Sequence, residues 1–206
     1  MSAAAGARPS YAEASRNLRR DMVLDAVHGL LADRAWAEVS MADVAERSGV
    51  SRQTLYNAFG GRQELAQAYV LREADRFVAA VEEAVRARAA DPRAAVAAAL
   101  EIFLSAAATH PLVRAISASE DGDELLPLVT TRGGPVLGRV TEQLAALIAA
   151  TWPSLPPAEA AHLADTLVRL AISHAALPSA SARATAAAVA RIVGPHIDEL
   201  LEPLAR

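Results

Sequence analysis

The chain has 206 residues, of which 53% are hydrophobic, and a net charge of −4 at pH 7. It contains no cysteine and no lysine, which excludes disulfides, thiolate zinc sites and cysteine nucleophiles and leaves arginine to make every strongly basic contact. About a quarter of the residues are alanine and only 4% are aromatic, a composition that favours many closely packed helices over sheets. The expected fold class is therefore all-α, with about nine helices.

The N-terminal residues 1–13 are mostly small or polar and lack a hydrophobic signal core, so we expect a disordered arm. No apolar run is long enough to cross a bilayer without a charge or a proline, and this predicts a soluble cytoplasmic protein without membrane contact. Over residues 16–31, apolar side chains recur at spacings of three and four, as in an amphipathic helix. Arg19 and Arg20 near its start can be solvated surface charges, which is the usual role of such residues.

Residues 40–62, SMADVAERSGVSRQTLYNAFGGR, contain two short helical patterns on either side of a glycine. Ser40 can cap the first helix, with Asp43 three residues later in the position of a capping-box acid. Gly49 supplies the backbone freedom that a tight turn between two helices requires. This arrangement is typical of a helix-turn-helix.

The second helix of the pair carries polar side chains suited to DNA. Ser51 can cap it, and Leu55 and Phe59 share one apolar face that points inward. The side chains left to face outward can donate to phosphates and read base edges in a major groove; they are Arg52, Gln53, Thr54, Tyr56 and Asn57. A plain pair of packed helices is the alternative interpretation of this stretch alone.

The string GVSRQTLYNAFGGRQEL closely resembles the recognition-helix signature of the tetracycline-repressor (TetR) family, and residues 18 to about 70 match that family's N-terminal pattern in order and spacing. The resemblance implies a ligand-responsive transcriptional repressor that binds palindromic operator DNA as a homodimer and is released by a small hydrophobic effector. We expect a helix-turn-helix DNA-binding domain at residues 14–61 and an effector-binding and dimerisation domain at residues 62–206. The expected DNA contacts are Ser40 and Ser51 together with the outward side chains of the second helix. The resemblance also implies that Arg19 or Arg20 lies near the DNA backbone, as an alternative to a solvated surface charge.

A long helix is expected from Arg62 to about residue 88, long enough to connect two domains. Free backbone N–H groups at its start can bind a phosphate, assisted by Arg62. Many members of the TetR family, which this chain resembles, carry a lysine at the position of Arg62 and a serine just before it. This chain has Gly61 in place of the serine, so the positive charge is kept and the side-chain cap is lost. The charge distribution gives weak support to DNA binding by the N-terminal part of the chain. Residues 1–62 carry eight arginines and seven acidic residues, whereas the remaining residues carry twelve arginines and seventeen acidic residues.

The middle of the chain predicts helices over residues 92–109, 112–119 and 136–151, separated by prolines, glycines and an acidic stretch at 120–124. The acidic stretch lacks the spacing of a hard-cation loop and is interpreted as a solvated loop. Apolar side chains of these helices can enclose a hydrophobic ligand, with a histidine and a tryptophan as possible polar handles. The expected ligand contacts are Phe77, Phe103, Leu104, His110, Ile116, Leu137, Val140 and Trp152.

The last two helices are expected over residues 158–176 and 181–204, with Pro195 bending the second. Both are apolar on more than one side, and a helix of this kind must be covered on both sides. A second copy of the pair would supply that cover as a four-helix dimer interface, although a core within one chain is the alternative. The expected interface residues are Leu163, Leu167, Leu170, His174, Val189, Ile192, Ile197, Leu200 and Leu201.

The sequence gives no positive sign of catalysis. The five histidines lack the spaced partners of a metal site, and neither a nucleophile elbow nor a glycine-rich phosphate loop is present. We therefore expect no enzyme activity, metal or cofactor. Two alternatives stay open: an activator or ligand-independent regulator of the same fold, and a helical ligand-binding protein that does not bind DNA.

Overall fold

The computed structural model of the chain describes residues 10–117, 125–129 and 134–201. Ten α-helices and one short 3₁₀-helix make up the regular structure of these residues, which contain no strand. The all-α prediction is confirmed, with one α-helix more than expected, the short α7 (Leu125–Val129). Two compact units divide between Tyr69 and Val70, inside α4 (Arg62–Arg86). The first two turns of α4 thus belong with the first unit, whereas the sequence placed the boundary at residue 62.

The first unit consists of α1 (Tyr11–Leu31), η1 (Trp36–Glu38), α2 (Met41–Ser48), α3 (Arg52–Phe59) and the start of α4. Ser10 caps α1 through a capping box with Glu13, so helix begins at Tyr11. The expected disordered arm is therefore wrong for residues 11–13, and residues 1–9 lie outside the described part. Trp36, Val44 and Leu55 are at most 1% exposed and form the centre of this unit's core.

The helix-turn-helix predicted at residues 40–59 is present. Ser40 and Asp43 form the expected capping box at the start of α2, and Ser51 caps α3 by accepting a hydrogen bond from the Thr54 N–H at 3.1 Å. Gly49 ends α2 in the left-handed conformation, with φ at 69°. A side chain there would be strained, which is why the turn needs glycine.

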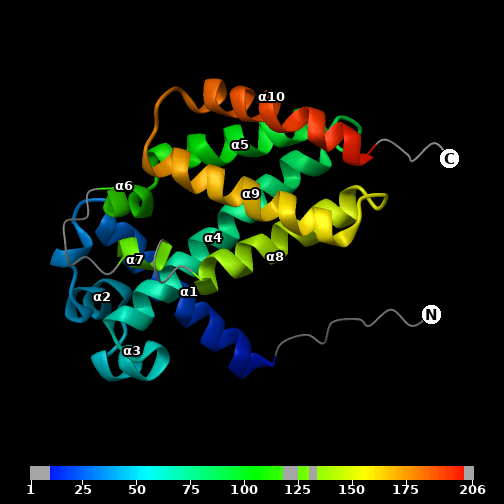
Figure 1. Cartoon of the computed structure of the whole chain (residues 1–206). Coiled ribbons are helices and arrows are strands. Elements are labelled where there is room, and N and C mark those ends of the chain that lie inside the picture. The colour runs from blue at the N-terminus through cyan, green and yellow to red at the C-terminus, as the bar shows by residue number, and fades with distance from the viewer. Residues whose placement is uncertain (1–9, 118–124, 130–133, 202–206) are drawn as a thin grey trace. The chain divides into compact units, whose positions relative to one another are not determined.

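The second unit contains the rest of α4 together with α5 (Pro92–Thr109), α6 (Pro111–Ser117), α7, α8 (Gly134–Thr151), α9 (Pro157–Ala176) and α10 (Ala182–Leu201). Helix α10 packs along α5, and α8 packs along α9, as the red, green and yellow helices of Figure 1 show. The last two helices therefore bury much of their apolar surface against earlier helices of the same chain. Pro195 lies inside α10 as expected, and the acidic stretch 120–124 and residues 202–204 lie outside the described part.

Helix α5 is the most apolar long helix of the second unit. By length and composition it could cross a membrane, with a mean hydropathy of 1.2, but Pro92, Arg93 and Glu101 interrupt its apolar run, as expected from the sequence. Such a helix is weak evidence for a membrane span because the core helix of a globular domain has the same composition. Here Val96, Leu100 and Leu104 are buried in the core, which accounts for the apolar sequence.

Two ion pairs connect neighbouring helices of the second unit. The Arg139 guanidinium on α8 binds both carboxylate oxygens of Asp75 on α4, at 2.8 and 2.9 Å, and this hydrogen bonding lowers the pKa of Asp75. Arg93 on α5 pairs with Asp198 on α10. Exposed ion pairs of this kind contribute little to the free energy of unfolding. They connect α8 with α4 and α10 with α5.

Gly49 offers a direct test of the helix-turn-helix geometry. A β-carbon at Gly49 would meet nothing within 4 Å, so Gly49→Ala changes only the backbone energy and should destabilise the chain by about 1–2 kcal/mol. Gly138, inside α8, also has open space around it, and Gly138→Ala should stabilise by about 0.5–1 kcal/mol. Chemical denaturation followed by circular dichroism measures both. Equal effects of the two variants would contradict the left-handed turn.

Candidate DNA-binding surface and ligand cavity

Helix α3 presents its polar side chains outward. Leu55 and Phe59 are buried, whereas Arg52, Gln53, Thr54 and Asn57 are exposed and Tyr56 is 48% exposed. Because α3 lies on the surface of its unit with a polar outer face, these five predicted side chains are accessible to a nucleic acid. Arg20 of α1 stacks over the Phe59 ring at 4.6 Å, which places a second arginine beside the end of α3.

A groove runs between the start of α2 and α3. Its lining includes Ser40, Arg52 and Tyr56, together with Arg62 and residues 37–42. The first backbone N–H groups of α2 lack partners within their helix, and such groups attract anions. The Ser40 N–H itself is already donated to the Asp43 carboxylate at 2.8 Å. Arg52 and Tyr56 therefore provide the side-chain donors of a surface suited to a phosphate.

Arg62 has a structural role that its sequence position did not reveal. Its guanidinium donates to the carbonyl oxygens of Trp36 and Val39, the latter at 3.1 Å, and stacks on the Trp36 ring at 4.6 Å. At the start of α4, the Gly61 N–H donates to the Glu64 carboxylate at 2.9 Å, which is one half of a capping box. Gly61 has no side chain that could form the other half, as the sequence predicted. The predicted phosphate contact of Arg62 stays a prediction.

A second polar contact holds α4 in the first unit. The Tyr69 hydroxyl lies 3.0 Å from Nδ1 of His28 on α1, and the Tyr69 side chain is fully buried. Together with Arg62, this contact fixes both ends of the first two turns of α4 to the helix-turn-helix core. These turns therefore move with the recognition helix α3 as one body.

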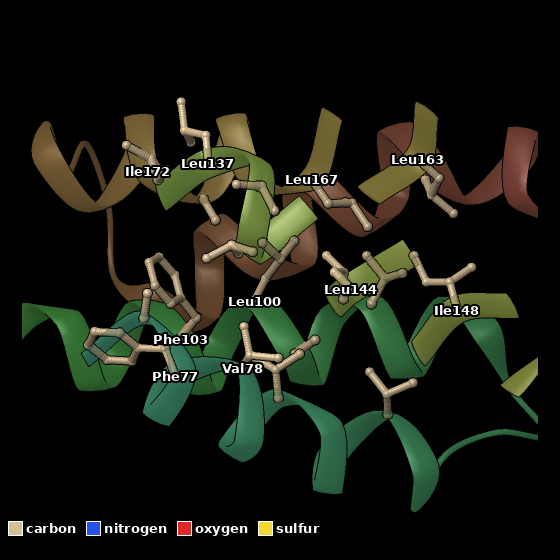
Figure 2. A pocket seen from close by; sticks show the side chains of 18 of the residues that line it. Phe77, Val78, Leu100, Phe103, Leu137, Leu144, Ile148, Leu163, Leu167 and Ile172 are labelled. Carbon is tan, nitrogen blue, oxygen red and sulfur yellow. The ribbon is translucent and has the colours of Figure 1, made fainter. Parts of the chain in front are cut away.

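The second unit encloses an apolar cavity of about 220 Å³. Helices α4, α5, α6, α8, α9 and α10 all contribute to its lining, and every lining side chain is aliphatic or aromatic. In Figure 2, Phe77 and Phe103 lie toward one end, near Ile172 and Leu137, and Ile148 and Leu163 lie toward the other. The Phe77 and Phe103 rings pack edge to face with centroids 5.1 Å apart.

The cavity is elongated. Its lining follows α4 from Val70 to Val85 and α9 from Leu163 to Ala176, a length of about 20 Å at the α-helical rise per residue. With carbon–carbon bonds of about 1.5 Å, this length accommodates an extended chain of about a dozen or more carbons. The shape therefore suits a chain-like molecule better than a compact one.

Six of the eight predicted ligand contacts line this cavity: Phe77, Phe103, Ile116, Leu137, Val140 and Trp152. Leu104 is buried elsewhere in the core, and His110 is not part of the lining. The sequence missed the contributions of α9 and α10, including Ile172, Leu200 and Leu201. The same apolar periodicity marks a core helix and a cavity wall, so no sequence signal separates the two.

Both expected polar handles have partners outside the cavity. The Trp152 Nε1–H donates to the Ala89 carbonyl at 2.9 Å. His110 Nδ1 accepts the Leu112 N–H at 3.2 Å, which places the ring proton on Nε2, 3.1 Å from the Glu73 carboxylate. The His110 ring also packs against Phe77. The N–H groups of these two side chains are therefore not available to a molecule in the cavity, and only Trp152 contributes its ring to the lining.

Glu73 forms a buried charge cluster next to the Phe77 end of the cavity. Its side chain is 2% exposed and accepts from His110, from Arg72 at 2.8 Å and from Arg76 at 3.3 Å. Burial by itself raises the pKa of Glu73, but the hydrogen bonds from His110 and Arg72 and the charges of Arg72 and Arg76 lower it to about 2. The carboxylate therefore stays ionised and anchors His110 behind the phenylalanines.

The predicted dimer residues need correction. Leu163, Leu167, Val189 and Ile197 are buried within the second unit, and Leu200 and Leu201 line the cavity, because α8 and α5 already cover these faces. Leu170 and His174 are half-buried. Ile192 differs from all of them, because its side chain is 74% exposed. It is the predicted interface residue best placed to meet a second chain.

Known proteins resemble this chain in both units. Residues 23–69 match the model of bacterial regulatory proteins of the tetR family, and residues 91–195 match that of the bacterial tetracyclin repressor C-terminal domain. The HTH-type transcriptional regulator AlkX of Mycobacterium tuberculosis (strain H37Rv) is 39% identical over 191 residues, covering 93% of this chain and 90% of the relative.

Solved structures of TetR-family regulators also resemble this chain. The TetR family repressor AlkX from Dietzia sp. strain DQ12-45-1b, described as implicated in biodegradation of n-alkanes, has a TM-score of 0.79 and 33% identity over 88% of this chain and 98% of its own. A TetR-family regulator from Pectobacterium atrosepticum has a TM-score of 0.65 and 18% identity, over 92% and 97% of the two chains. The second likeness supports the fold alone.

Glu73 makes a pH-dependent contribution to stability. Its pKa falls from 4.5 to about 2 on folding, so the contribution is present above pH 4.5 and is lost as the pH falls toward 2. Glu73→Gln should destabilise the chain at pH 7 by up to about 3 kcal/mol, and the difference from the unmodified chain should shrink below pH 4.5. Urea denaturation at a series of pH values measures this. Glu82→Gln, which breaks the exposed pair with Arg86 on the same helix, should have little effect at any pH.

Proposed function

The chain belongs to the TetR family of bacterial regulatory proteins, and we propose that it is a repressor that leaves its operator when an uncharged, elongated apolar molecule fills the cavity. Members of this family bind DNA and small-molecule effectors and form dimers. The observation that carries the proposal is the coexistence in one chain of an exposed polar recognition helix, α3, and a wholly apolar cavity whose wall includes α4.

The lining determines the chemistry of the effector. A carboxylate placed among aliphatic side chains would lose its hydration without gaining a partner, which costs several kcal/mol. Neither His110 nor Trp152 is oriented to receive it, because their N–H groups are bonded elsewhere. A neutral aliphatic chain meets no such penalty. The Dietzia relative's description as implicated in biodegradation of n-alkanes supports a long-chain hydrocarbon or a neutral product of similar shape.

Helix α4 provides the coupling between effector and DNA. Its first two turns are fixed to the helix-turn-helix core by Arg62 and Tyr69, and the segment from Val70 to Val85 forms part of the cavity wall. In the proposed mechanism, a ligand that displaces this wall shifts the recognition helix through α4, which is a continuous helix from Arg62 to Arg86. Release from DNA follows only if the ligand binds the displaced conformer more tightly than the DNA-binding one.

We propose that the chain acts as a homodimer in the cytoplasm and by binding alone, without catalysis. Two α3 helices, one from each chain, would enter successive major grooves of a palindromic operator about one helical turn apart. The dimer surface would include the outer face of α10, where Ile192 is exposed one helical turn from the half-buried Ala188.

The effector class can be tested with a matched series of ligands. A long-chain n-alkane, the primary alcohol and the carboxylate of equal carbon number are titrated into the chain while Trp152 fluorescence and operator affinity are followed. Trp36→Phe removes the only other tryptophan. The alkane and alcohol should change Trp152 emission and lower operator affinity tenfold or more, and the carboxylate should bind more weakly.

Leu144→Trp should fill part of the cavity and abolish the effector response while operator binding is kept. Its matched control is Ala146→Trp, because Ala146 lies on the same helix and is exposed. Tightest binding of the carboxylate would contradict the neutral effector, and an unchanged response in Leu144→Trp would contradict the cavity as the effector site.

The dimer surface is tested by a charge at its exposed isoleucine. Ile192→Glu should shift sedimentation toward the monomer and weaken operator binding, because two carboxylates would meet near the two-fold axis in a buried interface. The control is Ile102→Glu, the same change at an exposed isoleucine of α5, which should leave the dimer intact. A stable dimer of Ile192→Glu would place the interface elsewhere.

A further inference from the structure

The helices around the cavity differ in how closely they pack against one another. Helix α5 packs along α10, α8 packs along α9, and α6 packs against both α5 and α9. The part of α4 that follows Val70 lines the cavity, but α4 is absent from the closely packed helix pairs of the described residues. The cavity wall is therefore held together least tightly where α4 meets its neighbours.

Side chains join α4 and α8 at two places. At the first, Asp75 accepts hydrogen bonds from Arg139 at 2.8 and 2.9 Å and from the Gln143 amide at 3.0 Å. At the second, the Trp152 Nε1–H donates to the carbonyl of Ala89, just past the end of α4. The two places lie about 20 Å apart along each helix. The later part of α4 and α8 therefore run side by side in the same direction (Figure 1).

Between these two places the seam between α4 and α8 borders the cavity. Val78 and Val81 of α4 and Val140 and Leu144 of α8 line it, and all four side chains are half-buried. Figure 2 shows Val78 and Leu144 reaching into the cavity from the two helices. Leu100, which lines the cavity from α5, is buried. Solvent therefore approaches the cavity more closely at this seam than at α5.

The first place, the clasp of Asp75, Arg139 and Gln143, opens at low cost. The side chains of Arg139 and Asp75 are 52% and 37% exposed, and water readily replaces the partners of an exposed ion pair. Gln143 Oε1 is buried and has no hydrogen-bond partner in the described part of the chain. An unsatisfied buried acceptor costs free energy that hydration restores, so opening the clasp relieves this cost.

The contacts of α4 with α5 and α6 are less suited to opening. Phe77 packs edge to face on Phe103 of α5. Glu73, which is 2% exposed, is bonded to His110 at the start of α6. Separation on this side would break a buried charge cluster, which costs far more than breaking an exposed ion pair.

We infer that the seam between α4 and α8 is the entrance of the cavity and that the clasp is its gate. The backbone hydrogen bonds of each helix lie within that helix, so the two helices can separate here by moving side chains alone. An elongated apolar molecule enters sideways along the seam, and the clasp closes again over it. The inference rests on the proposed function, because it concerns the route by which the effector reaches its site.

Binding and release rates test the gate. Stopped-flow Trp152 fluorescence, with Trp36→Phe as background, follows a primary alcohol of about a dozen carbons. Arg139→Ala should raise both rate constants about two- to fivefold, as expected from the loss of an exposed ion pair, and leave their ratio, the Kd, nearly unchanged. The matched control is Arg93→Ala, which breaks the pair with Asp198 between α5 and α10 and should alter neither rate.

A faster release with a matching loss of affinity would overturn the gate. The clasp would then stabilise the bound form without controlling access to the cavity. Equal effects of Arg139→Ala and Arg93→Ala would overturn it as well, because the second pair lies on helices that pack closely together.

A covalent lock provides the opposite change. The chain contains no cysteine, so the double variant Asp75→Cys/Arg139→Cys has two thiols that a short bismaleimide can join. Before crosslinking, this variant should bind and release the alcohol faster than the unmodified chain. After crosslinking, both rates should fall about tenfold or more, because the gate cannot open. Arg93→Cys/Asp198→Cys, treated with the same reagent, should keep its rates. Mass spectrometry checks the link, and circular dichroism checks folding.

Failure of the inference and failure of the proposed function give different results. Unchanged rates in the crosslinked Asp75→Cys/Arg139→Cys variant would place the entrance elsewhere, while the cavity remains the effector site. If the carboxylate of equal length binds and the alcohol does not, the proposed neutral effector is wrong, and the carboxylate becomes the probe for the same rates. If neither molecule binds, the proposed function and the gate are both wrong.

Discussion

The contact of Arg62 with the Trp36 and Val39 carbonyls is the constraint on which the rest depends. It joins the start of α4 to the loop that leads into α2, and the buried Tyr69 hydroxyl repeats the connection two turns later. The first two turns of α4 are therefore held against the helix-turn-helix core. Past Val70 the same helix is part of the cavity wall, so α4 contributes residues to both units. The proposed coupling between effector and DNA relies on this continuity.

The apolar lining of the cavity and the buried charge cluster around Glu73 both reflect the free-energy cost of burying a polar group without a partner. An interior that must accept an apolar chain cannot contain unpaired polar groups, because each would lose its hydration. The structure instead places its polar groups behind the lining: His110 is bonded to Glu73, and the Trp152 N–H to a carbonyl. The Trp152 ring remains part of the lining. In the proposed function, selectivity then depends on the length of the effector and on the exclusion of charge.

Helix α3 has two rows of polar side chains on its exposed face. Arg52 and Tyr56 line the groove beside the start of α2, and Gln53 and Asn57 are joined by a hydrogen bond. Phosphate contacts set the register without carrying sequence information, whereas base contacts carry it. Residues 1–69 carry eight arginines and eight acidic residues, so the proposed DNA binding relies on a few well-placed contacts from two copies that bind together.

The sequence by itself determined the all-α class, the helix-turn-helix with its Ser40 and Ser51 caps and Gly49 turn, and most of the helix ends, because caps, prolines and apolar periodicity are local signals. It also placed six residues in the cavity. Only the tertiary structure decided that Arg62 donates to backbone carbonyls and that His110 is hydrogen-bonded to Glu73. It also decided that three predicted interface residues face inward, namely Leu163, Leu167 and Ile197. Those outcomes depend on which helices become neighbours, such as α10 on α5, and periodicity shows that a face is apolar without showing what covers it.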